Sequence, residues 1–207
     1  MLTLYGHANK LSINTLKIRV ALAEAGAPYQ YVTVDLAAGE QRKADFLALN
    51  PHGKVPVLVD GDFVLPESDA ILWYVAESFP AAQLLGPTAR ERARALEWCD
   101  FASTGLYPAY YDLHYHTLSA PPEKRIPAVA ETARQRLTHG LGALEVVLGN
   151  RVWLAGTHSI ADIANAVVLR GLRDRLPDLY DAAASPHTEA WYQGVLARPA
   201  WKSALEK

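Results

Sequence analysis

The chain has 207 residues, half of them hydrophobic, and a formal net charge of −2. This length suffices for one large domain or two small ones with a substantial core. The small net charge gives no electrostatic reason to expect nucleic acid or an anionic membrane surface as a partner. No apolar run approaches the roughly 20 residues that a transmembrane helix needs. We therefore expect no nucleic acid and no membrane among the partners.

The start of the chain, MLTLYGHANK, lacks a basic region followed by a continuous apolar segment, so we expect no secretory signal. The one cysteine, Cys99, excludes a disulfide within the chain and fits a reducing, cytoplasmic location. We expect it to be a small buried hydrophobic residue. The histidines form no metal-ligand pattern, because His114 and His116 would point to different faces of a helix. We therefore expect no metal.

The first third of the chain predicts a strand, a helix and a second strand. Residues 2–5 form a short strand, and Ser12 or Asn14 then caps a helix that ends near Ala25. The helix has two apolar faces, so we expect it to lie between a sheet and other helices. Residues 29–34 are rich in strand-forming types. This order is typical of a βαβ unit with parallel strands and a right-handed crossover.

Residues 50–71, NPHGKVPVLVDGDFVLPESDAI, form the most informative stretch. A short helix near residues 41–49 precedes it. Residues 57–59 predict a strand, Asp60-Gly61 a turn and residues 63–65 a second strand. A helix over residues 67–78 follows. Pro56 stands at the entrance of the first strand, where a missing N–H is tolerated.

The peptide bond before Pro56 can be trans or cis, and in general about 5–6% of such bonds are cis. A cis bond would leave the backbone N–H and C=O of Val55 free to pair with an extended peptide. Glu67 and Ser68 would then place a carboxylate, a hydroxyl and free helix N–H groups close by. The stretch predicts a cradle for a small, peptide-like, acidic ligand.

The rest of the chain predicts helices. Residues 81–88 read as a linker between residues 1–80, a small α/β half, and residues 89–207, an all-helical half. Thr88 can cap a long helix that continues through YPAYYDLHYH with a kink at Pro108. Apolar residues at three- and four-residue steps predict a helix over 126–148, starting from Ile126. Two further helices are expected over residues 189–197 and 200–206.

The tetrapeptide Ser159-Ile160-Ala161-Asp162 could be mistaken for a catalytic Ser/Asp pair. Ser159 suits the N-cap of a helix and Asp162 its third position, so each side chain can bond the other's backbone N–H. We interpret it as a structural capping box.

The motifs NPHGKVPVL and LPESDAI in a βαβ–ββα half, followed by a helical half with a Ser-x-x-Asp box, resemble the cytosolic glutathione S-transferases. The opening YGHANKLSINTLKIRVALAEAG is similar to bacterial members of that family that use a hydroxyl rather than a thiol. The resemblance covers essentially the whole chain. It implies a thioredoxin-like N-terminal domain with a cis Pro56, an all-α C-terminal domain, glutathione as co-substrate and a homodimer.

The resemblance also implies how glutathione is held. Val55 would pair with its main chain beside Pro56. Ser68 and the start of its helix would bind the γ-glutamyl carboxylate, and Glu67 the ammonium group. His52 and Lys54 are the candidate partners of the glycyl carboxylate, with a solvated loop as the alternative for both. Lys43 and Gln41 are weaker candidates.

Thiol activation needs a donor just after the first strand. Ser12 is the first choice, since the similar bacterial sequences have a serine there, although it could be a plain N-cap. Asn14 is the second choice. The other polar residues of the segment are weaker candidates: Tyr5, His7, Asn9 and Thr15. The segment has no cysteine, which argues against thiol-transferase chemistry through a mixed disulfide.

The second substrate is expected to bind beside the sulfur. Tyr110, Tyr111 and His114 can share a helix face and, with Tyr107, His7 and Leu11, line an apolar pocket with polar tips. The alternative is a core or dimer-interface stripe. The predicted function is conjugation of glutathione to small hydrophobic electrophiles. Glutathione-dependent peroxidase or isomerase activity, and a non-catalytic binding or regulatory module, are the alternatives.

Overall fold

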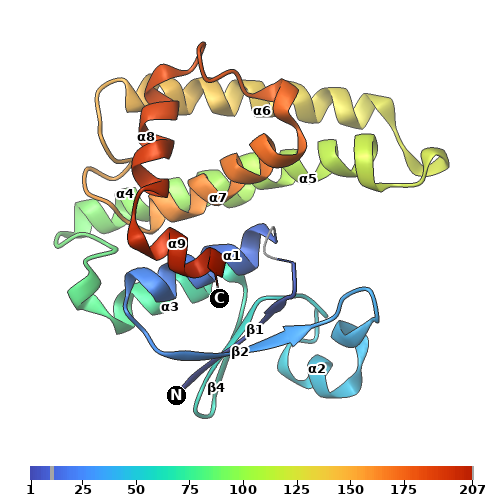
Figure 1. The fold of residues 1–207 in the computed structure, drawn as a ribbon, viewed down its shortest axis with the longest axis vertical. Helices are drawn as coiled ribbons and strands as arrows, with labels where there is room; N and C mark the ends of the chain where they lie inside the picture. Colours follow the sequence, from blue (N-terminus) through green and yellow to red (C-terminus); the bar gives the residue numbers. More distant parts are fainter. Residues whose placement is uncertain (10–11, 207) are drawn as a thin grey trace. The chain divides into compact units, whose positions relative to one another are not determined.

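The computed structural model describes residues 1–9 and 12–206 (Figure 1). It divides into two compact units. The first contains residues 1–84 and the segment from Arg198 onward, and the second contains residues 85–197. The first compact unit thus extends to residue 84 and includes the segment from Arg198 onward, which the sequence analysis assigned to the helical half.

The first unit is built on a four-stranded sheet with the order β2-β1-β3-β4. Strands β1 (Leu2–His7) and β2 (Tyr29–Val34) pair in parallel, as the βαβ interpretation predicts. Strands β3 (Val57–Asp60) and β4 (Phe63–Pro66) form the predicted hairpin, and β3 pairs antiparallel with β1.

Alternating side chains send the two faces of the sheet to different partners. Leu2 and Leu4 are buried on the face that α1 (Ile13–Glu24) and α3 (Ser68–Ser78) cover (Figure 1). On the other face, Val34 and Val57 pack with Phe46 of the short helix α2 (Ala44–Leu49). The 3-10 turn Glu40–Arg42 leads into α2.

Helix α1 is buried on two sides, as its two apolar faces predict. Ile18 and Leu22 are fully buried. Helix α9 (Pro199–Glu206) packs against α1 (Figure 1), and its Trp201 is fully buried. Just before α9, Arg198 binds the carboxylate of Glu24 through Nε at 2.5 Å and Nη2 at 2.7 Å. These contacts explain why the segment from Arg198 onward belongs to the first unit.

The second unit is helical throughout its regular structure. Its elements in chain order are α4 (Ala89–Asp100), a π-helical turn (Phe101–Leu106), α5 (Tyr107–His114), a second π-helical turn (Tyr115–Ser119), α6 (Pro127–Leu148), α7 (Ile160–Arg175) and α8 (Pro186–Leu196). Thr88 caps α4 in a capping box with Glu91. In α6 the predicted apolar face begins at Ala130, because Ile126 is the N-cap residue and its surface is 51% exposed. None of the helices in residues 1–9 and 12–206 is long and apolar enough to span a bilayer.

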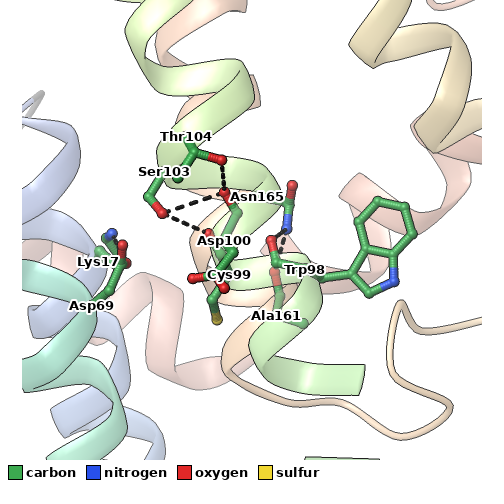
Figure 2. A network of polar contacts seen from close by, with 9 residues as sticks. All are labelled: Lys17, Asp69, Trp98, Cys99, Asp100, Ser103, Thr104, Ala161 and Asn165. Carbon is green, nitrogen blue, oxygen red and sulfur yellow. Dashed lines mark hydrogen bonds and ion pairs between the residues drawn. The ribbon is translucent and has the colours of Figure 1, made fainter. Parts of the chain in front are cut away.

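The irregularity expected at Pro108 lies one turn earlier, as the π-helical turn of residues 101–106. Pro108 has no N–H for the carbonyl four residues before it, so the helical ladder must change register near this point. Side-chain hydroxyls bind carbonyls in the altered turn: Ser103 donates to the carbonyl of Cys99 at 3.0 Å and Thr104 to that of Asp100 at 2.7 Å (Figure 2). Cys99 itself is buried, as predicted.

Helix α7 lies at the centre of the second unit, with nearly every residue from Ile160 to Leu172 buried. Asn165 in this helix donates to the carbonyls of Trp98 at 2.9 Å and Ala161 at 2.8 Å, which links α7 to α4 (Figure 2). The predicted capping box is confirmed: Ser159 accepts from the N–H of Ala161, and Asp162 accepts from the N–H of Ser159. Ser159 and Asp162 therefore have a structural role.

Candidate functional site

The sheet register brings three loops to one end of the first unit. Tyr5 of β1 pairs with Val57 of β3, and Val57 pairs with Pro66 of β4. The loop after β1, the loop before β3 and the junction between β4 and α3 therefore emerge next to one another. Those loops contain the predicted activating residues, the cis-proline loop and the Glu67-Ser68 pair.

Side chains on both sides hydrogen-bond the backbone of His7, where the loop after β1 begins. The N–H of His7 donates to Thr15 Oγ1 at 3.3 Å, and the Tyr31 hydroxyl donates to the carbonyl of His7. The N–H of Asn9 donates to Nδ1 of the His7 ring at 2.7 Å. A Cβ at Gly6 would lie 2.5 Å from Thr15 Cγ2 and 2.6 Å from the Tyr31 hydroxyl oxygen, so the loop can approach α1 this closely only with glycine there.

Ser12 occupies the N-cap position of α1, but its side chain makes no capping hydrogen bond. Its Oγ lies 3.4 Å from Thr15 Oγ1, and the residue is half-buried. The structure therefore does not support the alternative of a plain N-cap. Asn14 lies in the first turn of the same helix and is also half-buried.

Tyr5 points away from the activating loop. Because it occupies the opposite face of β1 from Leu4, its ring packs edge-on against Phe46 with 6.4 Å between the centroids. Packing was the expected role of Tyr5, and its place on the α2 side of the sheet removes it from the donors.

The peptide bond between Val55 and Pro56 is cis, as the resemblance implied. Asn50 organises the loop that leads to it. Its buried side chain donates to the carbonyl of Lys54 at 2.7 Å and accepts from the N–H of His52 at 3.0 Å. The side chains of His52 and Lys54 are exposed. Asn50 was not among the predicted site residues, although an Asn two residues before a loop N–H is a typical side-chain turn signal.

Glu67 has an unusual backbone at the junction between β4 and α3. Its φ is 71° and its ψ is 114°, a region that non-glycine residues rarely occupy. It is the N-cap residue of α3, it is exposed, and its side chain makes no capping bond. Ser68 begins the helix and is half-buried. The uncapped N–H groups and the hydroxyl of Ser68 are therefore suited to bind a carboxylate.

A buried ion pair anchors the start of α3. The ammonium group of Lys17, which is only 4% exposed, binds the carboxylate of Asp69 (Figure 2). This contact joins α1 to the first turn of α3, so the two helix N-termini that border the site are held to each other.

The two weaker candidates for the glycyl carboxylate already have partners. Lys43 pairs with Glu40 at 3.1 Å, where both side chains are well exposed. The Gln41 side chain donates to the carbonyl of Leu36 at 3.3 Å. His52 and Lys54 therefore remain the better candidates.

The aromatic residues of the second unit form a stacked column on α5. The rings of Tyr107 and Tyr110 are 6.4 Å apart and those of Tyr110 and His114 5.8 Å apart, nearly parallel in both cases. Arg175 lies 3.3 Å from Nε2 of His114. Burial, with Arg175 beside it, lowers the pKa of His114. Because arginine is always a donor, Nε2 accepts and the proton of the neutral ring lies on Nδ1.

Tyr111 is not part of the column that Tyr110 and His114 form, and its place in the electrophile pocket stays a prediction. One residue along a helix turns the side chain by about 100°. Tyr111 is 53% exposed and stacks on Tyr115, with 6.0 Å between the ring centroids. Leu11 lies outside the described residues. His7 belongs to the first unit and the aromatic column to the second, so a pocket shared by them stays a prediction.

In residues 1–9 and 12–206, no group of three or more His, Cys, Asp or Glu side chains could hold a metal ion. The polar groups around the three loops are hydroxyls and backbone amides, which can donate, and the Glu67 carboxylate, which accepts. Such a set suits recognition of a small zwitterionic ligand.

Two family models match the chain: the glutathione S-transferase N-terminal domain over residues 1–77 and the glutathione S-transferase C-terminal domain over residues 106–199. Glutathione S-transferase F10 of Arabidopsis thaliana is 33% identical over 100% of this chain and 97% of its own length. The glutathione transferase URE2P6 of Phanerochaete chrysosporium, solved with oxidised glutathione, is 27% identical and aligns with a TM-score of 0.89 over 99% of this chain and 94% of that chain.

A further solved structure is Ure2p5 of Phanerochaete chrysosporium, cocrystallised with 1-(S-glutathionyl)-2,4-dinitrobenzene. It is 29% identical and has a TM-score of 0.86 over 99% of this chain and 93% of that chain. These matches confirm the predicted fold class, a thioredoxin-like domain followed by a helical one. With both domain models matched and relatives aligned over almost its entire length, the chain belongs to the glutathione S-transferase family.

Proposed function

We propose that this protein is a glutathione transferase that conjugates the glutathione thiolate to small hydrophobic electrophiles. The register of Tyr5, Val57 and Pro66, which gathers the three loops at one end of the sheet, is the observation that supports it most. Relatives bound to oxidised glutathione and to a glutathionyl dinitrobenzene provide independent support.

In the proposed complex, the free backbone groups of Val55 pair with the main chain of glutathione. The N-terminus of α3 and the Ser68 hydroxyl bind the γ-glutamyl carboxylate, and Glu67 binds the ammonium group. His52 and Lys54 bind the glycyl carboxylate. In this assignment each of the two carboxylates and the ammonium group of glutathione has its own partner on the protein.

Thiolate formation is assigned to Ser12, with Asn14 as the second donor. A free thiol has a pKa of about 8.5, and lowering it by two units requires about 2.7 kcal/mol of preferential stabilisation of the anion. A hydrogen bond to a charged group supplies about 1.5–3 kcal/mol, and a helix N-terminus adds about 0.3–1 kcal/mol. The Ser12 hydroxyl at the start of α1 therefore suffices energetically.

The aromatic column of Tyr107, Tyr110 and His114 is proposed to border the electrophile. Its stacked rings offer flat apolar surface, and the neutral His114 adds no charge to it. We also propose that the protein acts as a cytoplasmic homodimer, which light scattering of the purified protein would test.

Calorimetric titration with glutathione, followed by an assay with 1-chloro-2,4-dinitrobenzene, tests the function. We expect binding in the micromolar to millimolar range and a measurable conjugation rate. Absence of binding at millimolar glutathione would exclude every glutathione-dependent activity. Binding without turnover of aryl halides, peroxides or isomerisable substrates would favour a non-catalytic module.

Glu67→Gly is expected to weaken glutathione binding without destabilising the fold. A positive φ at a non-glycine residue costs about 1–3 kcal/mol, and glycine removes this cost. Glycine also raises the entropy of the unfolded chain, which destabilises the fold by a smaller amount. The free energy of unfolding should stay equal or rise by up to about 2 kcal/mol. Loss of the carboxylate should raise the Kd for glutathione about 10-fold or more.

Gln83→Gly is the matched control for Glu67→Gly, because Gln83 is the other described non-glycine residue with a positive φ, at 52°. We expect it to leave glutathione affinity unchanged. Equal affinities of Glu67→Gly and the parent protein in calorimetry would remove Glu67 from the proposed site.

Thr15→Val should impair the activating loop while preserving shape. Thr15 is 2% exposed, and its Oγ1 accepts the N–H of His7 and contacts Ser12 Oγ. Leaving that N–H unpaired should lower the free energy of unfolding by about 1–3 kcal/mol. As Thr15 positions Ser12 and His7, we expect kcat to fall several-fold with little change in the Kd for glutathione.

Thr15→Ser retains the hydroxyl and should restore kcat to near the parent value. If Thr15→Ser and Thr15→Val lower kcat equally, the lost methyl packing rather than the hydroxyl is responsible, and the positioning role is wrong.

A further inference from the structure

A cavity of about 310 Å³ lies in the first unit between the end of α1, the start of β2 and α9. Its side chains with polar groups belong to Arg19, Tyr29 and Ser203. Small or apolar residues complete the lining: Leu22, Ala23, Gly26, Ala27, Pro28 and Ala204. Tyr29 pairs with Leu2 at the start of β1, whereas the candidate glutathione site lies beyond His7 at the end of that strand. The two sites are therefore at opposite ends of the sheet.

Arg19 is a buried cation without a polar partner in the described part of the chain. Its residue surface is 4% exposed, and its Nη2 is buried without a hydrogen-bond partner. Its guanidinium carbon lies 5.5 Å from the centre of the Tyr31 ring, a cation–π contact that satisfies none of its N–H groups. A buried charge is normally paired and hydrogen-bonded, so the guanidinium has unused capacity for an anionic partner.

The acceptors that an arginine near a helix end normally uses are occupied. The last carbonyls of α1 already accept backbone N–H groups at 2.9–3.1 Å: Ala21 from Ala25, Leu22 from Ala27 and Ala23 from Gly26. Glu24, the acidic residue of α1, is bound by both Nε and Nη2 of Arg198. These nearby acceptors are therefore bound by other donors, and Arg19 borders a cavity instead.

We propose that this cavity binds a small monocarboxylate that has a short apolar body. The guanidinium fork matches a carboxylate bidentately, and the Ser203 hydroxyl can donate a further bond. One uncompensated positive charge suits a monoanion, and the wall of Leu22 and Ala27 suits a few methylene groups. Gly26 is exposed, and a Cβ there would meet nothing within 4 Å, so the cavity is open to solvent on that side.

Thermal unfolding of the full chain with sodium butyrate tests the proposal, against sodium chloride at equal ionic strength. We expect butyrate at ten times its Kd to raise Tm by about 3 °C. Butyramide, which has the same shape without the charge, should have no effect. A response to butyrate no larger than that to chloride or butyramide would overturn the proposal.

Arg19→Gln should abolish the response to butyrate, and without butyrate its Tm should equal or exceed that of the parent, because an unpaired buried charge is removed. Ser203→Phe, which fills the cavity while Arg19 remains, should abolish the response independently. Arg92→Gln is the matched control, since Arg92 binds the carbonyl of Pro87 in the second unit and should leave the response intact. An unchanged response in Arg19→Gln would contradict the assignment.

Competition with glutathione separates this site from the candidate glutathione site. We expect the Kd for glutathione, measured by calorimetry, to be the same with and without butyrate. A Kd for glutathione that rises in proportion to butyrate would mean that butyrate occupies the positions of the glutathione carboxylates. The cavity beside Arg19 would then be rejected as the butyrate site.

Discussion

Ser12→Ala is expected to lower kcat/KM for 1-chloro-2,4-dinitrobenzene about 10- to 100-fold at pH 7, while glutathione binding changes less than about threefold. The hydroxyl is proposed to bond the thiolate, and a hydrogen bond to a charged group contributes about 1.5–3 kcal/mol. Ser12 makes no capping bond in the structure, so its loss should cost α1 little stability. Turnover and binding should therefore separate.

The pH profile gives the Ser12 prediction its sharpest test. Removing a donor to the anion raises the pKa of the bound thiol, so the rise of kcat/KM with pH should move to higher pH. The deficit of Ser12→Ala should then shrink toward pH 9. Ser12→Thr, which retains a hydroxyl, should keep the parent profile. A profile of Ser12→Ala that coincides with the parent's would transfer the role to Asn14, which Asn14→Ala would then reveal.

Asp162→Ala should lower the free energy of unfolding by about 3–5 kcal/mol. Asp162 is fully buried and accepts from the N–H of Leu154 at 3.1 Å, the N–H of Ser159 at 2.9 Å and Nε1 of Trp191 at 2.8 Å. Each donor left unpaired in the core costs about 1–3 kcal/mol. Urea unfolding followed by tryptophan fluorescence would measure the loss.

Two controls isolate this effect of Asp162. Ser159→Ala removes the N-cap bond from the N–H of Ala161 and a long, 3.4 Å bond from the Ser159 hydroxyl to Asp162, and should cost only about 1 kcal/mol. Asp174→Ala removes a partly exposed carboxylate of the same helix that pairs with Arg170 at 3.4 Å, and should cost less than about 0.5 kcal/mol. If Asp162→Ala lowers the free energy of unfolding no more than Ser159→Ala does, the three hydrogen bonds that Asp162 accepts do not stabilise the fold.

Asp162 also gives the fold a defined pH dependence. Burial raises the pKa of Asp162 to about 6, against an ordinary value of 3.8, although the donors around it act in the opposite direction. The folded state therefore holds this proton between pH 3.8 and about 6, where the unfolded chain releases it. The resulting stabilisation is fully present below pH 3.8 and is lost as pH rises through about 6. The stability gap between the parent and Asp162→Ala should be larger at pH 4 than at pH 7.5 by up to about 3 kcal/mol.

Local patterns predicted much of the fold. The hairpin of residues 57–66, the apolar faces of α1 and α6, and the Ser159–Asp162 capping box each depend on residues close together in sequence. The cis bond before Pro56 followed from the family resemblance, since the residues alone left it at a low prior. The π-helical turns were missed, because a single inserted residue in a helix barely alters the hydrophobic period.

The contacts that were not predicted join residues that local sequence patterns do not relate to one another. Thr15 was only a weaker donor candidate, and the structure shows that it accepts the N–H of His7 and contacts Ser12. The bond from the Tyr31 hydroxyl to the carbonyl of His7 was not predicted. The return of α9 to α1 depends on contacts such as that of Arg198 with Glu24, 174 residues earlier. The sequence analysis assigned no role to Arg19, and only the packed structure shows that it is buried.

The return of α9 has a consequence for how the protein is made. The first unit emerges from the ribosome early, but at that time the surface of α1 that α9 covers is still exposed. Residues 85–197 must be synthesised before that cover arrives, which at about 5–20 residues per second takes on the order of ten seconds. During this interval the nascent sheet domain presents an apolar face, and this face is where a chaperone would engage the growing chain.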